Sequence, residues 1–190
     1  MKRINRNDPR AVEEAVQILK TGGVIVYPTD TLYGFGVDAK NDQAINKLNE
    51  IKGRSGPISV MASNTEIALE WMEISVEQGD LVPFYLGGPK TLIVPVKTNI
   101  VSPLILGDNQ TLGIRIPDHP FCQKISAMFP NPITTTSVNR TNEKPMNDPD
   151  LISLEFAQEI DLVVDEGTLP ASVGSTIYQF INNNVKIIRE

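Results

Sequence analysis

The sequence predicts a single α/β domain built on a mixed, twisted β-sheet flanked by helices. Three observations predict it. The chain has 190 residues, of which 41% are hydrophobic, enough for one well-packed core. Apolar residues at helical spacing alternate along the chain with short β-branched runs typical of strands. No internal repeat, low-complexity tract or linker-like composition divides the chain, so we expect one domain over residues 1–190.

The first elements follow from local patterns. Asp8–Pro9 resembles a helix N-cap followed by proline at the first helical position, and apolar residues then recur at helical spacing from 12 to 19. A buried strand is predicted over 24–27, where the residues are β-branched or aromatic. The polar stretch 29–33 either holds a polar ligand, which the following Gly34 and Gly36 would let the backbone approach, or is a hydroxyl-rich surface turn.

The remaining elements are read in the same way. Asp42 and Asp118 are predicted to cap helices, Gly87–Pro89 to end one, and Asn182–Asn183 to form the turn of a hairpin. The polar segment 139–150 is expected to be a mobile loop. Helices are expected over 42–51, 65–72, 76–85, 118–129 and 151–160, and strands over 58–62, 91–96, 111–116, 133–137, 162–165, 175–180 and 185–188.

Charge and cysteine content exclude several classes of function. The 17 Lys and Arg residues against 23 Asp and Glu give a net charge of −6, which argues against a surface for non-specific nucleic-acid binding but leaves a local basic cavity open. The single cysteine, Cys122, can form neither an internal disulfide nor a thiolate metal site. Without an apolar leader or a run near the ~18 apolar residues of a membrane span, we expect a cytoplasmic protein with no membrane association.

Three cations are candidates for binding an anion. Lys52 and Arg54 follow a predicted helix in a tight, glycine-containing segment, which suits a phosphate-rich or carboxylate ligand. The alternative is a solvated helix C-terminus, where the helix dipole favours cations in any case. Arg115 lies within an apolar strand, so it either bridges to a carboxylate inside the protein or faces an anionic ligand.

Hydroxyl-rich segments at 29–33, 134–139 and 172–176 could converge on one polar cleft at the edge of the sheet. The only histidine, His119, is more simply explained by a role at a helix start than by a nucleophilic triad, and no two-histidine metal pattern exists. The sequence also lacks the Walker A and dinucleotide-binding glycine motifs. Cations, hydroxyls and backbone amides suit nucleotidyl or acyl-phosphate transfer through charge stabilisation.

Six ordered motifs then carry a resemblance to the YrdC/Sua5 family, the threonylcarbamoyl-AMP synthases. The resemblance runs from about residue 24 to 189, and the chain is similar to the short, single-domain YrdC type. The motifs are PTDTLYGFGVDA (28–39), KGR (52–54), GGPKTLIVP (87–95), LGIRIPDHP (112–120), TTTSVN (134–139) and GSTIY (174–178).

The resemblance implies a twisted sheet around a large, positively lined cavity. It also implies that L-threonine, bicarbonate and ATP are converted to L-threonylcarbamoyladenylate and pyrophosphate, the first step toward the t6A modification of tRNA. Mg²⁺ would arrive with ATP, without metal ligands from the protein. A downstream threonylcarbamoyl transferase complex would be a partner, and tRNA is a further candidate.

Matched motif by motif, the resemblance assigns the site residues. Lys52 and Arg54 would be catalytic, because they would neutralise charge on the leaving pyrophosphate. Arg115 would face the threonine carboxylate, and Tyr33 would help to wall the pocket. The threonine site would comprise Thr31, Tyr33, Arg115, Thr135 and Ser175, and the ATP site Lys52, Arg54, Thr111, Ser137, Asn139 and Arg189.

The sequence departs from the family pattern at three places. Only two residues separate Arg54 from Pro57, where the family commonly has a longer segment. Met61 stands where some members place a histidine, and the stretch 137–142 reads SVNRTN where Ser-Ala-Asn and a later Ser-Gly are usual. Two alternatives therefore stay open: a relative that forms a different carbamoyl adenylate, and a non-catalytic protein that binds double-stranded RNA or tRNA.

Overall fold

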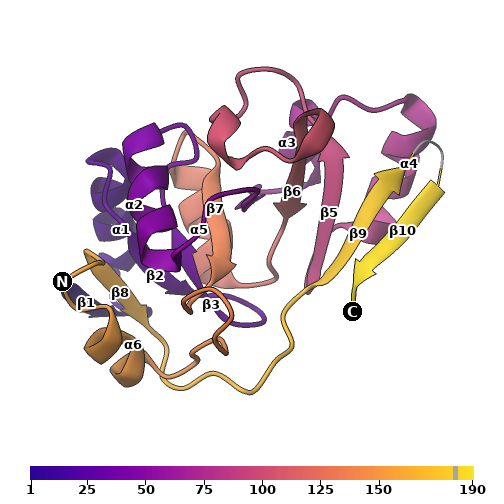
Figure 1. The fold of residues 1–190 in the computed structure, drawn as a ribbon. Coiled ribbons are helices and arrows are strands. Elements are labelled where there is room, and N and C mark those ends of the chain that lie inside the picture. Colours follow the sequence, from indigo (N-terminus) through magenta and orange to yellow (C-terminus); the bar gives the residue numbers. More distant parts are fainter. Residues whose placement is uncertain (182–183) are drawn as a thin grey trace.

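The computed structural model describes residues 1–181 and 184–190. In this part of the chain, ten strands form one mixed sheet in the order β1-β8-β2-β3-β7-β4-β6-β5-β9-β10 (Figure 1). The strands are β1 Lys2–Asn5, β2 Ile25–Pro28, β3 Tyr33–Gly36, β4 Ser59–Met61, β5 Lys90–Pro95, β6 Thr111–Arg115, β7 Ile133–Ser137, β8 Leu162–Asp165, β9 Thr176–Ile181 and β10 Asn184–Arg189. The helices are α1 Ala11–Lys20, α2 Asp42–Lys52, α3 Thr65–Trp71, α4 Val76–Tyr85, α5 Pro120–Met128 and α6 Pro149–Glu155, with short 3₁₀ turns at Pro103–Ile105 and Asp108–Gln110.

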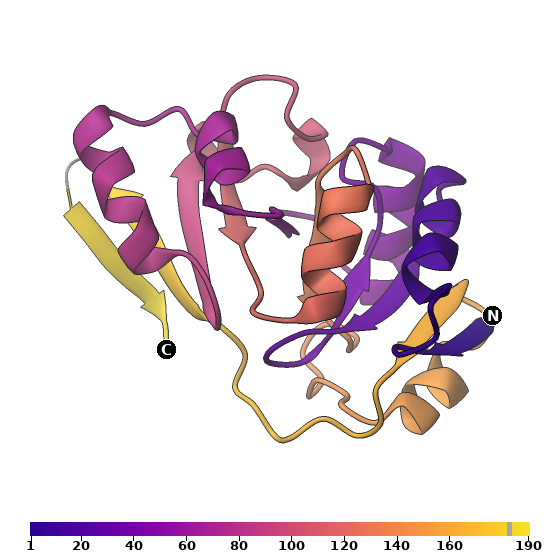
Figure 2. The ribbon, with the colours of Figure 1, turned by 180° about the vertical axis from the view of Figure 1, so that it is seen from behind.

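Strand β7 joins the two halves of the sheet. It pairs antiparallel with β3 on one side, where Gly34 lies opposite Ser137, and with β4 on the other, where Val60 lies opposite Thr134. The segment between β8 and β9 passes from one half of the molecule to the other, as both ribbon views show (Figures 1 and 2). The centre of the sheet is therefore bounded by segments that are distant in the sequence.

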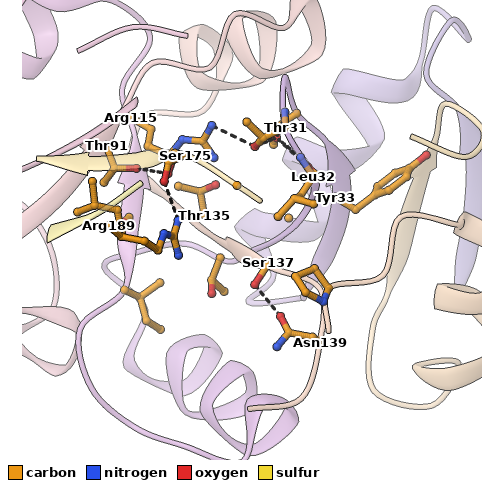
Figure 3. A pocket seen from close by; sticks show the side chains of 18 of the residues that line it. Thr31, Leu32, Tyr33, Thr91, Arg115, Thr135, Ser137, Asn139, Ser175 and Arg189 are labelled. Atoms are coloured by element: carbon orange, nitrogen blue, oxygen red, sulfur yellow. Dashed lines mark hydrogen bonds between the residues drawn. The ribbon is translucent and has the colours of Figure 1, made fainter. Parts of the chain in front are cut away.

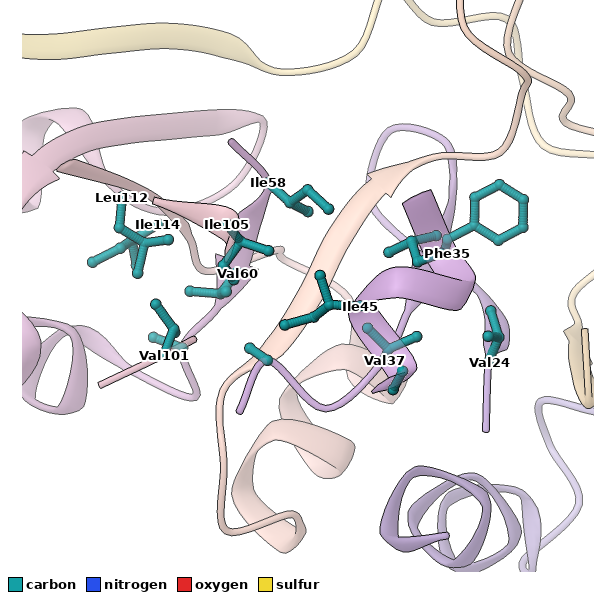
Figure 4. Close-up of a cluster of buried hydrophobic side chains, with 14 of the residues drawn as sticks. Val24, Phe35, Val37, Ile45, Ile58, Val60, Val101, Ile105, Leu112 and Ile114 are labelled. Atoms are coloured by element: carbon teal, nitrogen blue, oxygen red, sulfur yellow. The ribbon is translucent and has the colours of Figure 1, made fainter. Parts of the chain in front are cut away.

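Alternation along the strands divides the core into two clusters. Val24 and Val26 face one side of the sheet and belong to the larger cluster with Ile45 and Leu48 of α2 (Figure 4). Ile25, Tyr27, Met61 and Ile133 face the other side, where α1 and α5 stand side by side (Figure 2). Because both faces of the sheet are covered here, residues pointing to either side are apolar, and the strand reads as a continuous apolar run in the sequence.

Most predicted elements are confirmed, and α4 has the predicted bounds. The predicted caps, however, were wrong by one or two residues. Asp8 does not begin α1: its carboxylate accepts a hydrogen bond of 2.9 Å from the Arg10 backbone N–H and holds a turn before the helix. Asn41, rather than Asp42, caps α2 by accepting from two backbone N–H groups.

The second half contains similar shifts. His119, rather than Asp118, caps α5 through its ring nitrogen, which accepts from the Phe121 N–H, so the helix-start role of the histidine is confirmed. Helix α6 starts earlier than predicted because Asp148 caps it and Pro149 takes the first position, and it ends at Glu155 rather than at 160. The predicted turn at Asn182–Asn183 lies outside the described residues.

Gly34 and Gly36 both belong to strand β3, but only Gly34 lies where the sequence predicted a close approach to a ligand, because it lines the pocket described below and Gly36 does not. β3 pairs antiparallel with β2, and Gly36 lies beside the ring of Tyr27. A Cβ built on Gly36 would lie 2.7 Å from Cε1 of that ring, so this glycine is needed for packing inside the core. Among the described residues, no helix is long and apolar enough to cross a membrane.

Candidate functional site

A pocket of about 370 Å³ lies at the centre of the sheet (Figure 3). Its lining draws on both sides of β7, through Thr135 and Thr136, and on the end of α2, through Lys52. Ten of the eleven predicted site residues line it: Thr31, Tyr33, Lys52, Arg54, Arg115, Thr135, Ser137, Asn139, Ser175 and Arg189. Thr111 is not among the lining residues, and its hydroxyl donates to the Asp108 carbonyl instead.

The lining is strongly positive although the chain as a whole is negative. Four cations line the pocket, and none of its described lining residues is a carboxylate. The cations come from the end of α2 (Lys52 and Arg54), from β6 (Arg115) and from β10 (Arg189). Such a pocket favours ligands that carry several negative charges.

Thr29 builds the turn that presents Thr31. Its hydroxyl donates to the Leu32 carbonyl at 2.7 Å and accepts from the Thr31 backbone N–H at 3.1 Å, an arrangement typical of a hydroxyl-stabilised turn. The Thr31 hydroxyl then lies 3.4 Å from Nη2 of Arg115. Thr29 also lines the pocket, a role that its position in the predicted polar loop indicated only in general terms.

Of the two alternatives for Arg115, the bridge to an internal carboxylate is confirmed, and contact with an anionic ligand stays a prediction for a side chain that lines the pocket. Its Nη2 donates to Oδ1 of Asp30 at 2.8 Å, and both side chains are 9% exposed. The other Asp30 oxygen accepts from the backbone N–H of Asp118 at 3.1 Å, so the carboxylate is fixed on two sides. The Nε of Arg115 is buried and has no hydrogen-bond partner among the described residues, while the side chain as a whole lines the pocket.

Thr91 and Arg189 hold Ser175 in place from two sides. The hydroxyls of Thr91 and Ser175 are 2.7 Å apart, and Nη2 of Arg189 donates to the Ser175 carbonyl at 2.8 Å. Burial, together with the nearby charge of Arg115, lowers the pKa of Arg189. Sequence reasoning missed Thr91, because a threonine in a strand is fully explained by β-propensity.

At the other end of the pocket, Lys52 is buried and fixed. Its Nζ donates to the Ser137 carbonyl at 2.8 Å and to Oδ1 of Asn139 at 3.1 Å. Burial, with a smaller contribution from the charge of Arg54, lowers the pKa of Lys52 to about 8. Arg54 is exposed at the mouth of the pocket, and no hydrogen bond or ion pair joins its side chain to the described residues.

The ring of Tyr33 extends away from the pocket (Figure 3). Its hydroxyl donates to the Gly167 carbonyl at 2.8 Å and accepts from the Glu166 backbone N–H at 2.9 Å. Burial raises the pKa of this phenol to about 12. Tyr33 therefore fixes the start of the segment that leads to Ser175, while the part of the residue nearest the backbone contributes to the lining.

Of the residues that depart from the family pattern, one lies in the core and others line the pocket. Met61 is buried in the α1 and α5 core and does not line the pocket. Thr141 and Asn142 do line it, and Asn142 has a left-handed backbone with φ of 70°. No cluster of three or more His, Cys, Asp or Glu side chains that could hold a metal ion occurs among the described residues.

Comparison with known proteins agrees with this geometry. The family model Sua5_yciO_yrdC, described as telomere recombination, matches residues 17–190. The threonylcarbamoyl-AMP synthase of Vibrio campbellii is 36% identical over 138 residues, which cover 70% of this chain and 74% of that protein. The enzyme of the same name from Photobacterium profundum is 31% identical, with 83% of this chain and 87% of that protein covered.

Solved structures show the same fold. The crystal structure of P. abyssi Sua5 complexed with L-threonine superposes with a TM-score of 0.84 at 25% identity, and covers 94% of this chain and 53% of that one. E. coli YciO, at 22% identity and a TM-score of 0.87, covers 100% of this chain and 93% of its own, and supports the fold alone. Because the family model spans nearly the whole chain and encloses the pocket, this protein belongs to the YrdC/Sua5 family.

Proposed function

We propose that this protein is an L-threonylcarbamoyladenylate synthase, which forms threonylcarbamoyl-AMP and pyrophosphate from L-threonine, bicarbonate and ATP. The proposal rests on the lining of one pocket. Four cations and, among the described residues, no carboxylate line it. Hydroxyl groups lie at one end of this pocket and a buried lysine lies at the other. Relatives named threonylcarbamoyl-AMP synthase and a homologue crystallised with L-threonine support it.

L-threonine fits the end of the pocket that holds Arg115, Thr31 and Ser175 (Figure 3). The Arg115 guanidinium, which lines this end, would bind the threonine carboxylate, and the ion pair with Asp30 would keep it in place. The hydroxyls of Thr31, Thr135 and Ser175 supply neutral hydrogen-bonding groups for the ammonium and hydroxyl of the substrate.

ATP fits the end that holds Lys52, Ser137 and Asn139. Two of the three Lys52 protons are used within the protein, which leaves one for a phosphate oxygen. Arg54 at the mouth can bind a phosphate without breaking an existing bond. Arg189 reaches the lining from β10 beside Ser175 and would bind an ATP phosphate, whereas Thr111 has the weakest support because it lies outside the lining.

The reaction then depends on placement. The amine of threonine combines with bicarbonate to give a carbamate and water. A carbamate oxygen attacks the α-phosphorus of ATP, and the bond to pyrophosphate breaks. Lys52 and Arg54 would neutralise charge on the departing pyrophosphate, so positioning and electrostatics supply the acceleration. Without a carboxylate among the described lining residues, the pocket suits Mg²⁺ that arrives bound to the phosphates of ATP.

The test is pyrophosphate release by the purified protein with ATP, Mg²⁺ and bicarbonate, with L-threonine compared against L-serine, glycine and no amino acid. We expect release that requires both threonine and bicarbonate, with the threonylcarbamoyl adenylate detected by mass. Lys52→Met should abolish it, whereas Lys47→Met, on the same helix but bonded to the Gly22 carbonyl, should not. Release with another amino acid would point to a changed substrate. Salt-dependent RNA retention without turnover would favour a binding protein.

The chemical instability of threonylcarbamoyl-AMP indicates which kind of enzyme must act next. A mixed anhydride of a carbamate and AMP hydrolyses readily, so it must pass quickly to an acceptor. We therefore infer that a threonylcarbamoyl transferase complex acting on tRNA consumes it. Transfer of labelled threonine to tRNA in a mixture of this protein and such a transferase would test this step.

A further inference from the structure

Arg140 lies outside the pocket and makes an unusually dense set of contacts. Its guanidinium donates to both carboxylate oxygens of Glu159, at 2.7 and 3.3 Å, and to Glu155 at 3.1 Å. It also donates to the carbonyl of Ile51 at 3.1 Å and lies 5.1 Å over the ring of Phe156. One side chain thus joins the end of α2 to α6 and to the residues that follow it.

The loop that begins at Arg140 is fastened to the same place. The Thr141 N–H donates to the carbonyl of Lys52 at 2.9 Å, one residue beyond the Ile51 carbonyl that Arg140 binds. Further along, the Met146 N–H donates to the Val138 carbonyl at 2.8 Å. Loop 139–146 is therefore attached at both ends, and its first attachment is the C-terminus of the helix that carries Lys52.

Asn139 has no hydrogen-bonding capacity left for a ligand. Its Oδ1 accepts from Lys52 and from the Ser137 hydroxyl, at 3.1 and 2.6 Å. Its Nδ2 donates to the carbonyls of Arg140 and Glu143, at 2.7 and 3.0 Å. All four positions of the amide are thus used inside the protein, so Asn139 acts on a ligand through Lys52 rather than by direct contact.

We propose that Arg140 is a positioning residue for ATP: it holds loop 139–146 against α2 and α6 and thereby sets the Lys52 ammonium and the Asn139 amide. The substrate pocket itself does not include Arg140. An isolated surface ion pair would contribute little, but a forked guanidinium bonded to two carboxylates and a helix-end carbonyl, and stacked on a ring, fixes one geometry. The inference rests on the proposed function for the identity of the ligand.

The test is Arg140→Met, which keeps an unbranched side chain over Phe156 and removes the four hydrogen bonds. We expect the KM for ATP to rise about 10- to 100-fold, while the KM for L-threonine stays within about twofold. Hydrogen exchange of 139–147 should accelerate, most clearly at the Thr141 and Met146 amides. Arg10→Met is the matched control, because Arg10 pairs with Asp8 in an exposed turn far from the loop in sequence, and it should change neither quantity.

A wild-type KM for ATP in Arg140→Met would overturn the proposal, whether or not the loop exchanges faster. So would equal losses for ATP and threonine, since these would indicate general destabilisation. If Arg140→Met does not fold, Glu159→Gln leaves the bonds to Ile51 and Glu155 and should give the same pattern, with a smaller change. If the wild-type protein does not use ATP, the proposed function fails, but the exchange measurement still decides whether Arg140 holds the loop.

Discussion

Arg115 and Asp30 form a buried ion pair. Substituting one or both of them allows an effect on threonine binding to be distinguished from an effect on stability. Arg115→Ala should do two things at once. It removes the group proposed to bind the threonine carboxylate, and it leaves the Asp30 carboxylate in a site where the side chain is only 9% exposed. In a simple activity assay, the loss of stability would be mistaken for a loss of threonine binding. The experiment must therefore remove the unpaired Asp30 charge as well.

The magnitudes follow from the burial of the pair. Removal of one partner of a buried ion pair costs about 3–5 kcal/mol, a large share of the roughly 5–15 kcal/mol that stabilises a typical domain. For a chain of this length, that corresponds to a loss of roughly 6–20 °C in Tm. Loss of the charge-assisted bond to substrate should lower kcat/KM for threonine about 10- to 1000-fold.

The double variant Asp30→Asn, Arg115→Ala removes both charges. It should recover much of the stability, because the amide can still accept from the Asp118 N–H, while threonine use stays as poor as in the single variant. Thermal unfolding and pyrophosphate release at varied threonine measure the two effects separately. Wild-type threonine kinetics in the folded double variant would refute the assignment of Arg115, and an unchanged Tm in Arg115→Ala would refute the energetics.

Three further predictions concern other parts of the molecule. If protonated Lys52 binds phosphate, kcat/KM for ATP should fall about tenfold per pH unit above the lysine pKa of about 8. Lys52→Arg should move this fall to higher pH, and a flat wild-type profile up to about pH 10 would contradict the role of Lys52. Gly36→Ala should destabilise the fold by about 1–3 kcal/mol in denaturant unfolding, because its Cβ would lie 2.7 Å from the Tyr27 ring, and an unchanged midpoint would show that the core can adjust. Asn41→Ala should cost about 0.5–2 kcal/mol by removing the cap of α2, which Asn41→Asp should largely preserve.

Elements with strong local patterns were predictable from the sequence. The helix at Val76–Tyr85 starts after a serine that forms a capping box and is followed by glycines, so both ends carry local signals. Strand β1 was not predicted, because Ile4 is its only buried residue and it becomes a strand only by pairing with β8, about 160 residues away. Gly36 was misread for a similar reason: the ring that requires it lies on another strand.

The candidate site was predictable mainly through the resemblance of its motifs. Ten of the eleven residues named from the resemblance line one pocket, although they come from segments up to 158 residues apart (Thr31 to Arg189). The partners of those residues were not predictable. Nothing in the sequence joins Asp30 to Arg115, and Thr91 carries no signal beyond strand propensity. Arg140 lies between the Ser-Ala-Asn and Ser-Gly positions of the family pattern, where no particular residue is specified.

The position of β7 has a consequence for how the chain must be made. Strands β3 and β4 are complete by residue 61, but the strand that bridges them ends at Ser137. Until β7 emerges from the ribosome, the N-terminal half therefore has two unpaired strand edges and no continuous sheet.

β8 and β9 come later still, and β8 completes the pairing of β1 and β2. The nascent chain thus carries open edges through most of its synthesis, a state that favours association with other strands. Folding is expected to be largely post-translational, so a pause in translation before residue 133 should leave a protease-sensitive intermediate that depends on chaperones. The same strand that brings the two halves of the pocket together also sets the moment at which the protein can fold.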